Sequence, residues 1–116
     1  MNNSKQNNPP KYHRNIIIQD EYKNFILDKI SMKELATKHC LSYTRIRNIL
    51  IYIGWQFRIY LDMTENNALS DLLYSSPVAT KNYLRGQPEV LEKTLLAFDK
   101  FALHRIAEAE KFPNKL

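Results

Sequence analysis

Apolar residues recur every three or four positions along most of the chain, and this spacing predicts amphipathic α-helices. The first helix is expected from about Asp20 to Ile30. Two further helices are expected to begin after Ser31 and after Ser42, which completes a three-helix unit over residues 19–54. The predicted fold class is therefore mostly α, with this unit followed by a second small helical unit.

Residue types that commonly begin and end α-helices flank the predicted helices. Ser31 with Glu34 three positions later forms a capping box, in which each side chain accepts a hydrogen bond from the backbone of the other residue. Ser42 is a suitable N-cap for the following helix. Gly54 is predicted to end that helix, because glycine closes a helix C-terminus at little cost.

The helix predicted after Ser42 has two chemically different faces. Its apolar positions recur at helical spacing: Leu41, Ile46, Ile49, Leu50 and Ile53. The positions between them are polar or basic: Tyr43, Thr44, Arg45, Arg47 and Asn48. Such side chains suit base edges and phosphates, so two helices with a tight turn and a basic outer side predict a helix-turn-helix.

After this unit the apolar pattern changes to a period of two. Four large apolar residues alternate with more polar ones, as in a half-buried strand: Trp55, Phe57, Ile59 and Leu61. Such a strand can pair with residues 16–18 or with its own copy in a second subunit. A short β-strand or ribbon is one expectation for this segment, and an extended linker is the other.

The second half contains a segment that aligns with the first helical hairpin. A shift of 34 residues places Ser42 on Ser76 and the hairpin on residues 69–86. Ser76 as N-cap, Pro77 at the first helical position and Gly86 as the stop predict another helix, turn and helix. The segment is either a divergent internal repeat or a second amphipathic hairpin that aligns only because both are short.

The last predicted helix opens at Pro88 and carries a long apolar stripe. The stripe includes Leu91, Leu95, Phe98 and Ile106. It can form core inside the second half, or it can meet a second copy of itself in a homodimer. Because residues 59–116 alone bury little surface, we favour an intersubunit role for part of the stripe.

Positive charge is concentrated in the first half. The chain of 116 residues has a formal net charge of +5 at pH 7 and a pI of about 9.4. Residues 1–58 hold ten Lys or Arg against four Asp or Glu, whereas residues 59–116 hold seven against eight. The basic half is the half with the predicted helix-turn-helix, which favours a polyanionic partner.

The sequence indicates no other chemistry. Cys40 is the single cysteine, so neither an intramolecular disulfide nor a structural zinc site is expected, and a reducing cytoplasm is the natural setting. The chain has no phosphate-binding Gly-rich loop and no nucleophile motif. We expect no enzyme activity, cofactor, metal or small-molecule ligand, and no apolar run is long enough to predict a membrane span.

Residues 22–58 resemble the homeodomain-like helix-turn-helix domains of bacterial and phage regulators and recombinases. The likeness lies in Glu-Leu-Ala-Thr-Lys-His, Leu-Ser-Tyr-Thr-Arg-Ile-Arg-Asn-Ile-Leu and Gly-Trp-Gln-Phe-Arg. It implies that the helix after Ser42 enters the major groove, and that Arg58 lies near the DNA backbone. The implied contacts are Tyr43, Thr44, Arg45, Arg47 and Asn48. Cys40 departs from the pattern, because glycine is common at that turn position.

Residues 69–86 resemble, more loosely, the helix-turn-helix units of phage repressors. This second resemblance covers eighteen residues and ends in Asn-Tyr-Leu-Arg-Gly. It implies that Thr80, Lys81 and Arg85 are further candidate DNA contacts.

The expected organisation has three parts. Residues 1–14 form a flexible N-terminal arm, residues 15–58 a helix-turn-helix DNA-binding domain, and residues 59–116 a helical unit that ends in a dimerisation helix. The expected function is that of a cytoplasmic, homodimeric transcriptional regulator that binds double-stranded DNA sequence-specifically. A helical protein-interaction or assembly module, such as an adaptor or a small packaging subunit, is the alternative.

Overall fold

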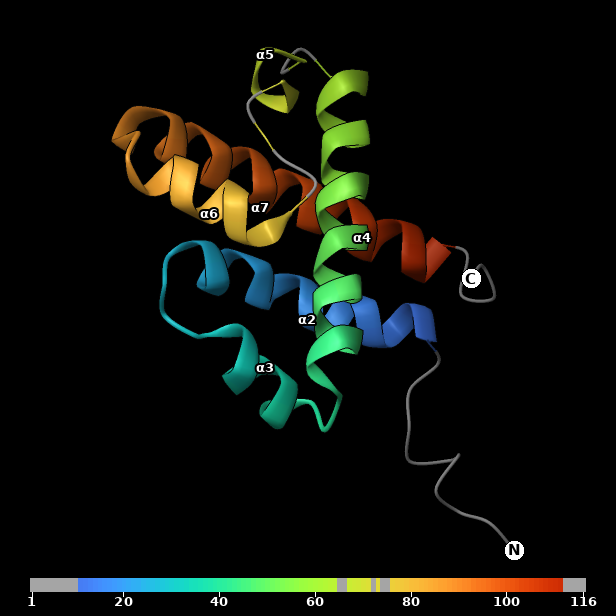
Figure 1. The fold of residues 1–116 in the computed structure, drawn as a ribbon. Helices are drawn as coiled ribbons and strands as arrows, with labels where there is room; N and C mark the ends of the chain where they lie inside the picture. Colours follow the sequence, from blue (N-terminus) through green and yellow to red (C-terminus); the bar gives the residue numbers. More distant parts are fainter. Residues whose placement is uncertain (1–10, 65–66, 72, 74–75, 112–116) are drawn as a thin grey trace, which may run out of the picture.

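The computed structural model describes residues 11–64, 67–71, 73 and 76–111. The helices follow the order α2 (Lys11–Ile26), α3 (Met32–Lys38), α4 (Tyr43–Met63), α5 (Asn67–Ser70), α6 (Pro77–Arg85) and α7 (Pro88–Lys111). No strand occurs among the described residues, and the predicted mostly α class is confirmed. In Figure 1, α4 crosses in front of α2 and α7, with α3 beside its first turns and α5 near its C-terminal end.

α4 is one continuous helix of 21 residues. The predicted stop at Gly54 is wrong, and so are the strand and the linker predicted for residues 55–61, which are helical. The glycine serves close packing instead, because a Cβ at Gly54 would lie 3.2 Å from the hydroxyl oxygen of Tyr22 in α2. Within the alternating segment, Phe57 and Leu61 are four residues apart and both fully buried, so a helical period is also present there.

α2 begins and ends earlier than the sequence indicated. It starts at Lys11 instead of Asp20, so residues 16–18 are helical and are not a strand. Residues 11–14 of the predicted flexible arm are helical too, and residues 1–10 lie outside the described residues.

The C-terminus of α2 is set by Asp28, which has a φ of 61°. The Asp28 amide donates to the Phe25 carbonyl at 3.0 Å, and the Lys29 amide donates to the Asn24 carbonyl at 2.9 Å. This pair of bonds is a Schellman motif, and aspartate is among the few residues other than glycine that tolerate its left-handed position. The helix consequently ends at Ile26 and not at Ile30.

A single hydrophobic core joins the two halves of the chain. The Tyr22 ring of α2 stacks on the Phe98 ring of α7, with centroids 5.3 Å apart. The Phe57 ring of α4 meets Phe98 edge-on at 5.1 Å and lies 5.2 Å from Phe101. The predicted boundary between residues 58 and 59 thus falls inside α4, and the chain on either side of it contributes to the same core.

The apolar stripe of α7 belongs mainly to this core. Phe98 is buried and Leu91 packs against the core, whereas Ile106 is exposed. The intersubunit role favoured for the stripe is therefore wrong at Phe98, because neighbouring aromatic rings enclose its side chain.

α6 begins and ends as the sequence predicted. The Ser76 hydroxyl accepts a hydrogen bond from the Ala79 amide at 3.3 Å, Pro77 is the first helical residue and Gly86 follows the last. The helix expected before it is represented by α5, which spans only Asn67–Ser70.

Candidate nucleic-acid interface

The turn between α3 and α4 is closed by a residue in the left-handed conformation. Cys40 has a φ of 55°, and its amide donates to the Thr37 carbonyl at 3.2 Å. The Leu41 amide donates to the Ala36 carbonyl at 2.9 Å, which completes a second Schellman motif. Cysteine thus occupies the left-handed position where glycine is common, and the departure noted in the sequence leaves the turn intact.

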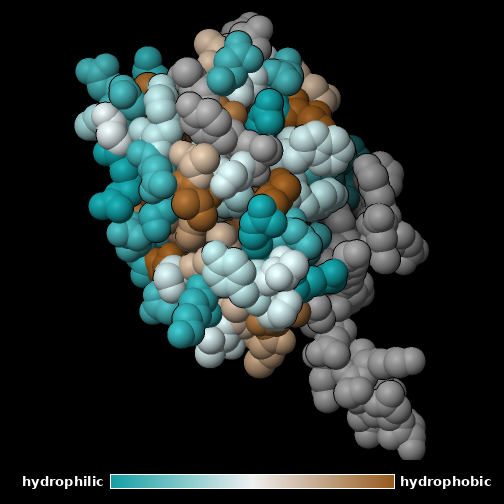
Figure 2. Space-filling model, in the orientation of Figure 1, coloured by the Kyte–Doolittle hydropathy of each residue, from teal (hydrophilic) through white to brown (hydrophobic). Residues whose placement is uncertain are grey.

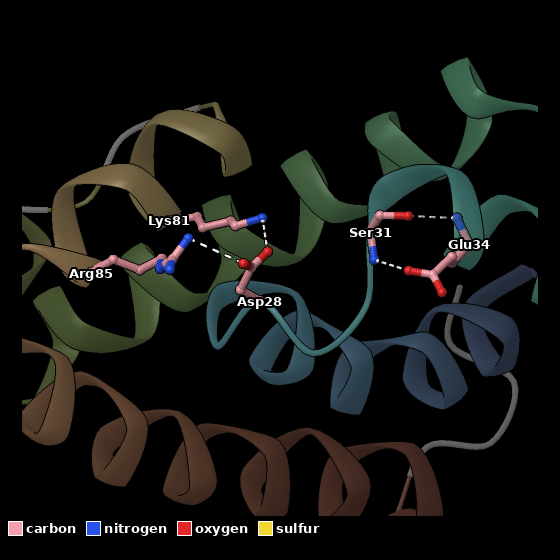
Figure 3. Close-up of polar contacts among 5 residues, drawn as sticks. All are labelled: Asp28, Ser31, Glu34, Lys81 and Arg85. Carbon is pink, nitrogen blue, oxygen red and sulfur yellow. Dashed lines mark hydrogen bonds and ion pairs between the residues drawn. The ribbon is translucent and has the colours of Figure 1, made fainter.

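Both helices of this hairpin are capped as predicted. The Ser31 amide donates to Glu34 Oε1 at 2.9 Å, and the Glu34 amide donates to Ser31 Oγ at 3.0 Å (Figure 3). The hydrogen bond from the Ser31 backbone lowers the pKa of the Glu34 carboxyl. At the start of α4, the Ser42 hydroxyl accepts from the Arg45 amide at 3.0 Å.

The first turns of α4 separate a buried face from an exposed one. The buried face contains Ile46, Ile49, Leu50 and Ile53. Tyr43, Thr44, Arg47 and Asn48 are exposed, and Arg45 is half-buried. Among the described residues, Arg47 has no ion-pair partner and remains available to a ligand.

Arg58 lies elsewhere on α4. It is eleven residues beyond Arg47, which places it about 16 Å further along the helix axis. Its side chain is half-buried, and its Nε has no hydrogen-bond partner among the described residues. Burial raises the pKa of the nearby Tyr22 hydroxyl, and the charge of Arg58 opposes this shift. The structure therefore does not bring Arg58 together with the five candidates at the start of α4.

The three candidates of the second hairpin are buried or paired within the fold. Thr80 is fully buried. Lys81 Nζ lies 2.6 Å from Asp28 Oδ1, and Arg85 Nη1 lies 3.1 Å from Asp28 Oδ2 (Figure 3). Lys81 also lies over the Phe25 ring, 4.7 Å from its centroid. The contacts of Lys81 and Arg85 join α6 to α2 and the loop after it, and the assignment of the three residues to DNA binding stays a prediction.

Positive charge gathers around the α3–α4 hairpin. Residues 29–48 contain five Lys or Arg and one Asp or Glu, a difference of +4. Lys38 is partly neutralised, since its Nζ lies 2.6 Å from Glu21 Oε2. Lys29, Lys33 and Arg47 are exposed. By comparison, α7 contains four Lys or Arg against five Asp or Glu, so the surface charge is uneven.

Sequence reasoning missed two exposed aromatic residues on α4. Trp55 is 54% exposed and Tyr52 is 37% exposed, and their ring centroids are 6.3 Å apart. The signal was present, because Tyr52 and Trp55 follow Asn48 at four and seven residues, the spacing of one helix face. The assignment of Trp55 to a strand concealed it.

Comparison of the chain with protein-family models, with curated proteins and with solved structures finds no match. Across the described ranges, no cluster of three or more His, Cys, Asp or Glu has the arrangement of a metal site. None of the described helices combines the length and apolarity that crossing a bilayer requires.

Proposed function

We propose that this protein is a sequence-specific double-stranded DNA-binding protein, of the kind that regulates transcription in bacteria or phages. The first turns of α4 enter the major groove, and the opposite face of the helix stays in the core. The observation that carries the proposal is the exposed set of Thr44, Arg47 and Asn48 directly after a left-handed turn. Arginine pairs with guanine and asparagine with adenine through two hydrogen bonds each, so these residues have the chemistry of base recognition.

The charge around the hairpin supports the same orientation. Lys29 precedes α3 and Lys33 lies in its first turn, and both are exposed. Exposed lysines near a base-reading helix neutralise phosphates and fix the position of the protein on the duplex. Binding should consequently weaken steeply as the salt concentration rises.

The test is a binding titration with a randomised duplex at two salt concentrations, followed by selection of the preferred sequence. We expect Arg47→Ala to cost about 1–3 kcal/mol on the selected duplex and to relax the preference at one position. Lys100→Ala removes the same charge from an exposed position on α7 and should bind like the wild type. Equal affinity of wild type and Arg47→Ala at low salt would refute α4 as the reading helix.

A second candidate function, assembly through protein contacts, is favoured by the outer face of α7. Leu96 and Leu103 are seven residues apart and are 60% and 68% exposed. Two such faces can pair in a homodimer, which would also give a small DNA-binding unit two half-sites. Sedimentation should show a concentration-dependent dimer for the wild type and a monomer for Leu103→Glu. A wild type that stays monomeric at high concentration argues against this contact.

A further inference from the structure

We propose that Tyr52 and Trp55 extend the DNA-reading face of α4 and contact thymine methyl groups in the major groove. The inference rests on the proposed function, and it adds a preference for thymine that Arg47 and Asn48 do not supply. Both aromatic side chains are exposed, although tryptophan and tyrosine carry large apolar surfaces that folding usually buries.

The two rings lie on the side of α4 that also carries Asn48. Residues seven apart on an α-helix point in nearly the same direction, so Trp55 lies above Asn48 along the axis. Their separation along the helix axis is about 10 Å. A helix that places Asn48 on a base edge therefore carries Trp55 to a neighbouring part of the same groove.

Asn48, Tyr52 and Trp55 are all exposed on the described structure. In Figure 1, α4 lies in front of α2 and α7 where it crosses them. Figure 2 shows the molecule in the same orientation, and hydrophobic residues reach its surface in small groups between hydrophilic ones. Such a mixed surface suits a groove that presents both polar base edges and apolar methyl groups.

The aromatic pair is supported from inside the fold. The guanidinium carbon of Arg105 in α7 lies 5.7 Å from the Tyr52 ring centroid and 5.7 Å from that of Phe101. Arg105 is itself buried, so Tyr52 packs against a side chain that is fixed within the core. The Tyr52 and Trp55 ring planes meet at 49°, and the pair is presented by a helix and not by a loop.

The charges on α4 favour a nucleic acid over an apolar protein surface. Residues 43–61 contain three arginines and no acidic residue. The next acidic residue, Asp62, accepts a hydrogen bond from the Ser70 hydroxyl at 2.5 Å. The exposed Trp55 therefore lies on a helix surface that is free of negative charge up to Asp62, which suits an anionic ligand that also presents an apolar group. In the major groove that apolar group is the thymine methyl.

The experiment uses the full chain and the selected duplex, with each thymine replaced in turn by uracil, which lacks the methyl group. At one or two positions the replacement should weaken wild-type binding about fourfold, the effect of losing one methyl-sized apolar contact. The same replacement should leave the affinity of Trp55→Ala unchanged. Trp55 is the only tryptophan of the chain, so its fluorescence should also change when the thymine duplex binds.

Met63→Ala is the matched control, because it also removes an exposed apolar side chain from α4. This variant should keep the wild-type sensitivity to uracil, and circular dichroism should show that both variants are folded. Equal uracil effects in wild type and Trp55→Ala overturn the inference, while an Arg47-dependent affinity in the same titration leaves the proposed function standing. A wild type that binds no duplex overturns both. Fluorescence that changes with protein concentration alone assigns the face to a contact between copies and overturns the inference.

Discussion

Asp28 and Lys81 are 53 residues apart in the chain, and their side chains meet with Lys81 Nζ 2.6 Å from Asp28 Oδ1. Asp28 has a left-handed backbone conformation at the end of α2, while Lys81 belongs to α6. Asp28 therefore has two roles. Its backbone ends α2, and its carboxylate joins the loop before α3 to the second half of the chain. Lys81 lowers the pKa of this carboxyl.

We expect Asp28→Asn to separate these two roles. Asparagine tolerates the left-handed conformation, so the end of α2 should remain as it is, while the attraction to Lys81 and Arg85 is lost. The melting temperature at pH 7 should fall slightly, because exposed ion pairs contribute little. The melting temperature of Asp28→Ala should fall further, since alanine is strained in the left-handed conformation. Equal melting temperatures for both variants would show that the backbone role is absent.

The left-handed turn at Cys40 predicts a substitution that stabilises the protein. Cysteine carries a Cβ that makes its φ of 55° unfavourable, and glycine removes this strain. Cys40→Gly should raise the free energy of unfolding by up to about 1 kcal/mol, because the relieved strain exceeds the extra chain entropy of glycine. Cys40→Ala is the control, and it should leave stability unchanged. The measurement is urea denaturation followed by circular dichroism under reducing conditions.

The shared aromatic core predicts that the two halves do not fold separately. Phe98→Ala should cost about 3–5 kcal/mol, as expected for a buried aromatic residue. Lys100→Ala, at an exposed position on the same helix, should change stability by less than about 0.5 kcal/mol. A fragment of residues 1–64 leaves Tyr22 and Phe57 without their partner Phe98, and it should show no cooperative unfolding. A fragment that melts cooperatively would contradict the single core.

Glu21 predicts a pH dependence of stability. Lys38 donates to Oε2 at 2.6 Å and lowers the pKa of the Glu21 carboxyl below its ordinary value of 4.5. Because the pKa is lower in the folded state, the contribution to stability is fully present above pH 4.5 and is lost as the pH falls through the folded-state pKa. Glu21→Gln should lower the melting temperature at pH 6, and the difference from wild type should shrink below pH 4. A constant difference across this range would contradict the ion pair.

Local signals in the sequence predicted the helix caps well. Ser31, Ser42 and Ser76 each cap a helix as expected, because capping depends on a few neighbouring backbone groups. The helix end predicted at Gly54 was wrong because this glycine makes a tertiary contact. Its small size accommodates the Tyr22 hydroxyl of another helix. The positive φ of Cys40 fits the turn position that the resemblance assigned to it, although cysteine is not a residue type that signals this conformation.

The candidate site was only partly predictable. Helical spacing correctly separated the exposed Thr44, Arg47 and Asn48 from the buried isoleucines of α4. The same spacing in α6 gave no information about Asp28, whose position opposite Lys81 and Arg85 depends on how α6 packs against α2. Contacts between residues far apart in the chain decide which cations remain available to a ligand.

α4 has a mechanical consequence because it is unbroken from Tyr43 to Met63. Its length is about 31 Å, and the Gly54–Tyr22 contact lies near its midpoint. Buried residues recur along the helix from Ile46 to Leu61, so the core holds α4 on both sides of this contact. The direction of its exposed first turns is therefore fixed by the same packing that joins the two halves of the chain.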